Sequence, residues 1–226
     1  MKKNTAAAPL RDFRFSKLQT PAYRHLKLLA FWPVYGMLFL FIERFCPGKQ
    51  YHPVQCALDR YIPFCEWFFL PYCAWFFFVG GVLFYAAGHD APAFTALMRY
   101  IIVTHLSALT IYFFYPTCQN LRPAAFPRAN ALTRCVAALY AIDTSTNVCP
   151  SIHVLGAVGA WLASLRMARF RSAAWRVFFF AAMVLISIST VFIKQHSAMD
   201  VLMALPLCLL GWLLCFHSRS GNAPSG

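Results

Sequence analysis

The sequence predicts an all-α, polytopic membrane protein with six transmembrane helices in a bundle. Hydrophobic residues make up 60% of the 226 residues and charged residues only 12%, which departs strongly from the usage of soluble globular domains. The apolar residues gather in runs of about 20, the length that a helix needs to cross a bilayer. Most of the 20 Lys and Arg residues lie in the polar segments before, between and after those runs. The chain is therefore expected to form one membrane domain with little soluble extension.

Charge and cysteine content limit the expected partners and cofactors. The net charge of +13 could favour nucleic acid, but the basic residues form no patch interleaved with aromatic residues on a soluble domain. Contact with anionic membrane lipids is expected instead, with no nucleic acid and no obligate protein partner. The nine cysteines show no CxxC spacing, so no metal site and no cofactor are expected. A disulfide among the loop cysteines stays open: Cys46, Cys56, Cys118, Cys135 and Cys149.

The N-terminal half of the chain is expected to hold three spans. Residues 1–27 are basic and predict a cytoplasmic segment, and the membrane domain is predicted over 28–216. The first apolar run, 28–45, is long enough to span and is interpreted as a retained helix, not a cleaved signal peptide. The second span is predicted at 61–87, where two prolines are expected to bend it. Its one acid, Glu66, is expected to have a structural partner, because an intramembrane carboxylate usually faces the bundle or a wet cavity.

The third span is predicted at 93–115, with His105 as a hydrogen-bonded core histidine. A long loop, 116–150, follows, and loops of this length are commonly functional. Within it, 131–142 is predicted to form a short helix on the surface. The remaining spans are predicted at 151–167, 175–193 and 197–216, ahead of a short polar tail at 217–226.

The placement of Lys and Arg predicts the orientation in the membrane. With a cytoplasmic N-terminus, 13 of the 20 basic residues lie on the cytoplasmic side and 7 on the other. This bias favours cytoplasmic N- and C-termini. The loop after the third span and the starts of the fourth and sixth spans then share the outer face, where the active site is expected. The compact chain favours a bacterial plasma membrane as its location.

Three polar clusters converge on that outer face. The first contains Tyr115 and Arg122, whose planar guanidinium suits bidentate phosphate binding. The second, Pro150-Ser151-Ile152-His153, opens the fourth span. The free N–H groups at a helix start bind anions, and the Ser151 hydroxyl adds a donor. His153, one turn in, could protonate a leaving oxygen.

The third cluster joins the last two spans and contains Lys194, His196 and Asp200. On a helix, residues four apart lie on one face, so the Asp200 carboxylate can orient the His196 imidazole. An imidazole held in this way is a competent nucleophile. Lys194 could neutralise phosphate charge, although extension of its ammonium toward the membrane interface accounts for it equally well.

Arg122-Pro123, Pro150-Ser151-Ile152-His153, and Ser189 with His196 and Asp200 resemble, in this order, the three motifs of the type 2 phosphatidic acid phosphatase superfamily. The resemblance covers roughly residues 28–216. It implies a six-helix, haloperoxidase-like core and metal-independent chemistry through a phosphohistidine. It also implies that His196 is the nucleophile, Asp200 its orienting acid and His153 the acid for the leaving group. Arg122 and Ser151 would bind the phosphate.

Two positions depart from the family pattern. The first motif usually begins with Lys, and Tyr115 stands at that position. The third motif usually has Arg directly after its Ser, and Thr190 follows Ser189 here. Lys194 could supply one of the two missing cations. The pattern also resembles the branch of the superfamily that contains head-group transferases such as inositol phosphorylceramide synthase.

The leading hypothesis is a membrane phosphatase that acts on a lipid phosphomonoester or pyrophosphate at the outer leaflet. The same chemistry with an alcohol acceptor gives a lipid head-group phosphotransferase of the inositol phosphorylceramide or sphingomyelin synthase type. A non-catalytic lipid-binding or transport protein on the same scaffold is the third hypothesis, since two expected cations are missing.

Overall fold

The computed structural model describes residues 10–45 and 50–217, and these residues are mostly helical. The first nine residues of the basic segment, Cys46, and the tail from residue 218 onward lie outside the described residues. The α-helices of the described ranges are α1 (Phe31–Arg44), α2 (Phe69–His89), α3 (Ala91–Phe114), α4 (Ala131–Ile142), α5 (Ile152–Ser164), α6 (Ala173–Phe192) and α7 (Ala198–Trp212). Short 3-10 turns extend several of them.

Five helical segments are long and apolar enough to cross a membrane, which indicates an integral membrane protein. They are Arg24–Arg44, Glu66–His89, Ala91–Phe114, Ala173–Phe192 and Ala198–His217. These correspond to five of the six expected spans. The second begins at Glu66 and not at residue 61 as expected. Pro63 disfavours helical backbone at Ile62, and Cys65, the residue before the first turn, is extended with a φ of −143°.

The fourth expected span, 151–167, corresponds to α5, which has only 13 helical residues. Its length of about 20 Å is less than the roughly 30 Å of bilayer hydrocarbon. Helix α5 contacts α2, α3, α6 and α7, so it lies at the centre of the bundle. Close approach there depends on two glycines. A Cβ on Gly156 would lie 2.8 Å from the Trp75 ring, and one on Gly159 would lie 2.6 Å from the Tyr100 ring.

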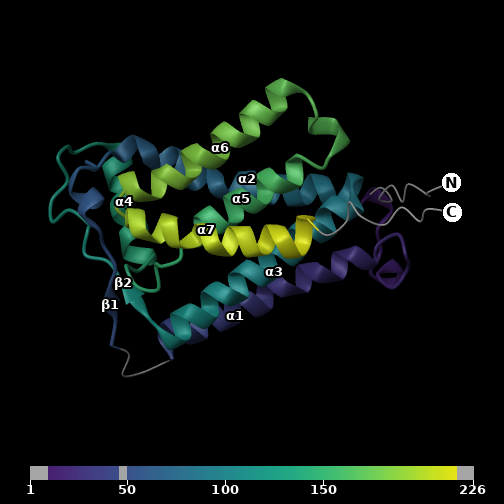
Figure 1. The fold of residues 1–226 in the computed structure, drawn as a ribbon, viewed down its shortest axis with the longest axis horizontal. Coiled ribbons are helices and arrows are strands. Elements are labelled where there is room, and N and C mark those ends of the chain that lie inside the picture. Colours follow the sequence, from purple (N-terminus) through teal and green to yellow (C-terminus); the bar gives the residue numbers. More distant parts are fainter. Residues whose placement is uncertain (1–9, 46–49, 218–226) are drawn as a thin grey trace.

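The long helices run side by side, while α4 and the two strands gather at one end of the bundle (Figure 1). Residues 10–12 and the end of α7 lie at the other end (Figure 1). Strands β1 (His52–Pro53) and β2 (Thr117–Cys118) pair in parallel, a small sheet that the prediction of an all-α fold did not include. The predicted surface helix 131–142 is confirmed as α4.

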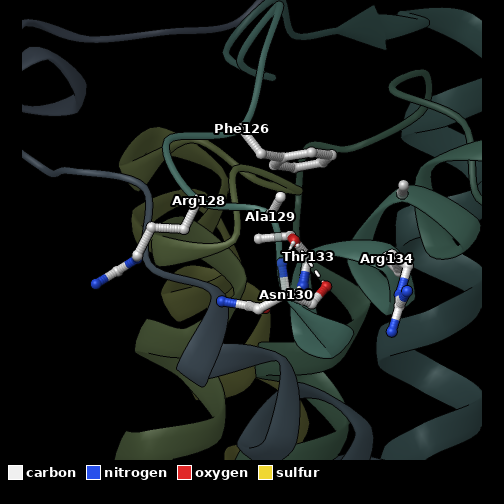
Figure 2. A pocket seen from close by; sticks show the side chains of 7 residues that line it. Phe126, Arg128, Ala129, Asn130, Thr133 and Arg134 are labelled. Atoms are coloured by element: carbon white, nitrogen blue, oxygen red, sulfur yellow. Dashed lines mark hydrogen bonds between the residues drawn. The ribbon is translucent and has the colours of Figure 1, made fainter.

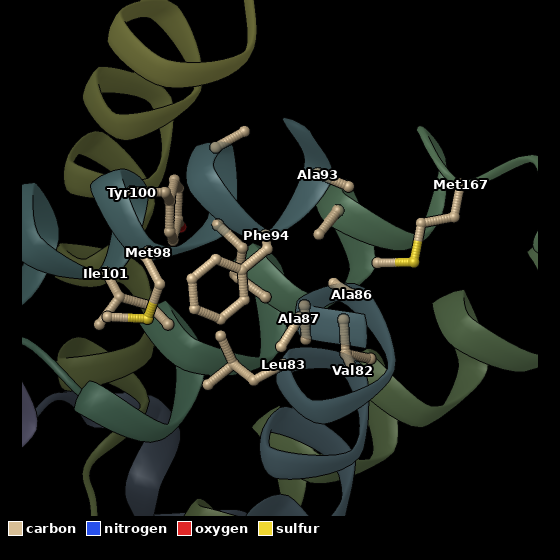
Figure 3. Close-up of a cluster of buried hydrophobic side chains, with 14 of the residues drawn as sticks. Val82, Leu83, Ala86, Ala87, Ala93, Phe94, Met98, Tyr100, Ile101 and Met167 are labelled. Atoms are coloured by element: carbon tan, nitrogen blue, oxygen red, sulfur yellow. The ribbon is translucent and has the colours of Figure 1, made fainter. Parts of the chain in front are cut away.

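The main core lies between α2, α3 and α5, where Phe94 is fully buried (Figure 3). Leu97 of α3 is fully buried in the same cluster. The described part of the basic N-terminal segment packs against this core. Tyr23 is only 4% exposed, and the His25 ring forms a hydrogen bond of 3.0 Å with the Ala87 carbonyl. His105 is confirmed as a hydrogen-bonded core histidine, since it is buried and its Nδ1 lies 3.2 Å from Thr104 Oγ1.

Glu66 has the structural partners that were expected, and they hold α4 in place. Its buried carboxylate accepts hydrogen bonds from Arg128 at 3.0 Å and from Asn130 at 2.9 Å. Asn130 caps α4, and its side-chain oxygen accepts a bond from the Thr133 N–H at 2.9 Å (Figure 2). A cavity of about 340 Å³ lies beside this helix start, next to Phe126 (Figure 2). The long loop is therefore anchored to the start of the second span.

Eight cysteines lie in the described ranges, and all of them are free.

Candidate functional site

The start of α7 fixes the pair His196 and Asp200. Ser197 is the N-cap, and its hydroxyl accepts a hydrogen bond from the Met199 N–H at 3.0 Å. Asp200 stands at the third helical position, where its Oδ2 accepts the Ser197 N–H at 2.9 Å. The same oxygen lies 3.1 Å from His196 Nδ1, so the predicted pairing of the two side chains is present. With Nδ1 donating to a fully buried carboxylate, Nε2 is the ring nitrogen left for chemistry.

The turn before α7 fixes the position of the His196 ring. The Gln195 and His196 N–H groups both donate to the Thr190 carbonyl, each at 3.0 Å. Lys194 has a left-handed φ of 56°, which is uncommon for a residue other than glycine. Its ammonium donates to the carbonyls of Asp59 and Ile62, at 3.2 and 2.5 Å. Lys194 therefore ties the turn to the loop before α2.

Asp59 holds the same turn from the other side, and the sequence did not single it out. Its carboxylate accepts hydrogen bonds from Ser197 Oγ at 2.7 Å, the Ala198 N–H at 2.8 Å and the Cys56 N–H at 2.8 Å. Burial by itself raises the pKa of Asp59, but these hydrogen bonds outweigh it and leave the pKa below its ordinary value. The signal in the sequence was only that Asp59 is one of 7 acidic residues.

The start of α5 brings His153 against His196. Their ring centroids lie 5.8 Å apart in an edge-to-face arrangement. The His153 ring also stacks on Tyr72 at 4.3 Å and contacts Trp75 at 4.8 Å. The Trp75 indole N–H donates to the His153 carbonyl at 2.9 Å, and the Ser151 N–H donates to the Asp200 carbonyl at 3.1 Å. The predicted second and third clusters therefore meet in space.

Arg122 joins this site through Gln195. Its Nη2 donates to Gln195 Oε1 at 2.7 Å and to the Asp143 carbonyl at 2.6 Å, while Nη1 donates to the Tyr140 carbonyl at 3.0 Å. The guanidinium also lies 4.3 Å from the centroid of the Tyr140 ring. Gln195 Nε2 donates in turn to the Asp143 carboxylate at 2.6 Å. The guanidinium predicted to bind phosphate thus also braces the loop that precedes α5.

The Asp143 carboxylate also accepts the Tyr72 hydroxyl at 3.1 Å, so this network reaches the ring that stacks on His153.

Four buried hydrogen-bonding atoms around the two histidines have no partner within the described residues. One is an acceptor, Asp200 Oδ1, and the three that can donate are Arg122 Nε, Ser151 Oγ and His153 Nε2. An unsatisfied buried polar group costs about 1–3 kcal/mol, so a ligand that pairs with them would offset that cost. A guanidinium, a hydroxyl and an imidazole beside the N-terminal turn of α5 suit an oxyanion.

Tyr115 lies apart from these groups. Its half-exposed ring stacks on His52 at 4.1 Å, next to the β1–β2 pair. Within the described residues, no hydrogen bond or ring contact joins Tyr115 to His153 or His196. Thr190 is fully buried, and its hydroxyl donates to the Ser187 carbonyl at 2.8 Å, so it serves the backbone of α6.

No group of three or more His, Cys, Asp or Glu side chains within residues 10–45 and 50–217 is arranged to hold a metal ion. Comparison with family models, with curated proteins and with solved structures gives no match for this chain.

Proposed function

We propose that this protein is a membrane lipid-phosphate phosphatase that works through a phosphohistidine on His196. Its substrate in this proposal is a lipid phosphomonoester or pyrophosphate. The observation that carries the proposal is the meeting of two histidines from different helices. One, His196, has Nδ1 held by the buried Asp200 carboxylate, and the other, His153, lies edge-to-face against it.

The arrangement supports a two-step displacement. In the first step, His196 Nε2 attacks phosphorus and the bond from phosphorus to the lipid oxygen breaks. His153 gives its proton to that leaving oxygen, which departs as the lipid alcohol, or as the lipid monophosphate when the substrate is a pyrophosphate. In the second step, His153 takes a proton from water as the water attacks phosphorus. The bond between phosphorus and His196 breaks, inorganic phosphate leaves, and both histidines return to their starting state.

The anion-binding groups of the site can stabilise the negative charge of the phosphate. The Ser151 hydroxyl and the Arg122 Nε–H are donors that find no partner among residues 10–45 and 50–217, and the α5 N-terminus adds its dipole. Asp200 stabilises the positive charge that develops on His196. Lys194 and Tyr115 are given no contact with phosphate in this proposal, because the Lys194 ammonium donates to two carbonyls and the Tyr115 ring stacks on the His52 ring.

The proposal includes a six-helix core of the phosphatidic acid phosphatase type, with α5 as its short central helix. Both termini lie in the cytoplasm and the site on the outer face in this proposal, on the basis of the Lys and Arg bias. The compact chain favours a bacterial plasma membrane as the location.

A lipid head-group phosphotransferase is the second candidate. It is favoured by the positions of Tyr115 and Thr190, which stand where the phosphatase pattern has cations and which bind protein groups here. The first step would be the same, and an alcohol would take the place of water in the second. Analysis of the products separates the two, because hydrolysis gives free phosphate and transfer gives a new phospholipid or sphingolipid.

The test compares phosphate release from a panel of lipid phosphates in detergent with EDTA present. His196→Ala is expected to abolish release, while His89→Ala, an exposed histidine at the end of α2, is the matched control and keeps the wild-type rate. An acid-labile phosphate trapped on wild type but not on His196→Ala would support the intermediate. Retention of the wild-type rate by His196→Ala on every substrate would refute the proposal.

A further inference from the structure

An apolar groove of about 610 Å³ runs between α2 and α6. Its walls include Pro71, Ala74, Phe78 and Gly81 of α2 and Ala182 and Ile186 of α6. Of all the side chains that line it, only that of Tyr85 carries a polar atom, and the Tyr85 ring is stacked on His89. A groove of this composition offers nothing to a polar ligand.

The groove lies where a hydrocarbon chain is the available occupant. Both α2 and α6 are long and apolar enough to cross a membrane, so their outer surfaces face lipid. Phe77 is 82% exposed and Phe178 is 54% exposed, and both line the groove. The lined stretch of α2 runs from Leu70 to Tyr85, about 22 Å at the helical rise. One leaflet of the hydrocarbon core is about 15 Å deep, so the groove can take an acyl chain along its length.

The groove adjoins the candidate site through Trp75. Phe78 and Ile186, which line it, pack in one cluster with Trp75. The Trp75 ring contacts the His153 ring at 4.8 Å, and its N–H donates to the His153 carbonyl. Trp75 thus shares a cluster with two groove residues and contacts His153 directly.

We propose that this groove binds one hydrocarbon chain of the lipid whose phosphate is cleaved between His153 and His196. The substrate class is then a long-chain lipid phosphate that the protein holds by its chain as well as by its phosphate. The inference rests on the proposed function for the identity of the lipid. A chain in this groove would place its head at the level of Tyr72 and Trp75, the residues of α2 that contact His153.

Gly81 makes the groove testable. It lines the groove, and a Cβ built there meets no atom within 4 Å. It lies ten residues beyond Pro71, about 15 Å along α2, where only a long chain would reach. Gly80 is its neighbour, has the same open space around a Cβ, and does not line the groove. Gly81→Leu should therefore obstruct the groove, and Gly80→Leu is a matched control with the same change in helix propensity.

The experiment uses phosphatidic acid that carries a diazirine near the end of one palmitoyl chain, incorporated in nanodiscs with the full-length protein. After illumination, mass spectrometry maps the crosslinked residues in wild type, Gly81→Leu and Gly80→Leu. Crosslinks to groove residues are expected in wild type and Gly80→Leu, with a severalfold loss in Gly81→Leu. Ala182→Leu, on the opposite wall, gives a second obstruction if Gly81→Leu does not fold.

Kinetics with two chain lengths give a second readout. Gly81→Leu should raise KM severalfold for dipalmitoyl phosphatidic acid and leave KM for the dioctanoyl form unchanged. Crosslinks that are spread over the lipid-facing surface, or that both obstructing variants leave unchanged, would overturn the groove assignment even if phosphate is released. Crosslinks confined to the groove without any phosphate release would keep the groove as a lipid-chain site and refute the phosphatase.

Discussion

The Asp59 carboxylate is expected to determine how firmly the His196 turn is held. In Asp59→Asn an amide NH₂ replaces one of two oxygens that together accept from Ser197, Ala198 and Cys56. The Ser197 hydroxyl can rotate and accept a hydrogen bond instead. A backbone N–H cannot, so whichever side the amide nitrogen occupies, one N–H loses its partner.

The size of the effect follows from these bonds. An N–H left without a partner costs about 1–3 kcal/mol. Loss of the charge weakens the remaining bond to roughly half its strength and removes a favourable anion at the α7 N-terminus, worth about 0.3–1 kcal/mol. Together these effects lower the free energy of unfolding by about 3 kcal/mol. Because 1 kcal/mol shifts the thermal unfolding midpoint of a chain this long by about 2–4 °C, we expect Asp59→Asn to lower that midpoint by about 10 °C.

The assay is thermal unfolding in detergent, followed by phosphate release well below the lower midpoint. The matched control is Asp90→Asn at the N-cap of α3, where, within the described ranges, the side chain accepts only the Ala93 N–H at 3.0 Å. Asn caps a helix as well as Asp does, so this variant should unfold like wild type. Equal midpoints for the two variants would show that the Asp59 contacts do not hold the turn.

Three further outcomes are expected. Gly159→Ala forces a Cβ to 2.6 Å from the Tyr100 ring and should lower the free energy of unfolding by about 1–3 kcal/mol. Gly80→Ala adds its Cβ in open space and should be neutral or stabilising. Equal thermal midpoints for the two variants would contradict the close helix packing. Arg122→Lys should lose most phosphate release and also lower the thermal unfolding midpoint. One ammonium cannot reach the two carbonyls and the Gln195 amide that the guanidinium joins. An unchanged thermal midpoint would argue that Arg122 does not hold the loop before α5 in place. The pKa of Asp59 is lower in the folded state than its unfolded value of about 3.9, so the ionised carboxylate stabilises the fold above that pH, and this stabilisation is lost as the pH falls through the folded pKa. The thermal midpoint of wild type should therefore drop more between about pH 5 and pH 3 than the midpoint of Asp59→Asn. Parallel plots of midpoint against pH would contradict the lowered pKa.

Much of the membrane architecture could be predicted from composition and run length. The five long apolar helices and the surface helix α4 lie where the sequence placed them, apart from small shifts at their ends. Helix start signals are also local. Ser197 caps α7 and Asp200 closes the capping box. The spacing of four residues between His196 and Asp200 was therefore enough to predict the contact of these two side chains.

The short α5 could not be predicted in the same way, because its apolar run is as hydrophobic as a spanning helix and only its surroundings differ. Burial on several sides lets small residues such as Gly156 and Gly159 lie against the rings of Trp75 and Tyr100. Periodicity carries no information about which neighbour fills such a space.

The sequence by itself determined which side chains could perform phosphate chemistry and on which helix starts they stand. Only the tertiary structure decided what those side chains bind. In the fold, the Lys194 ammonium donates to the carbonyls of Asp59 and Ile62, and the Tyr115 ring stacks on the His52 ring. Their partners come from segments far away in the chain, and a buried donor takes whichever acceptor packing brings within reach.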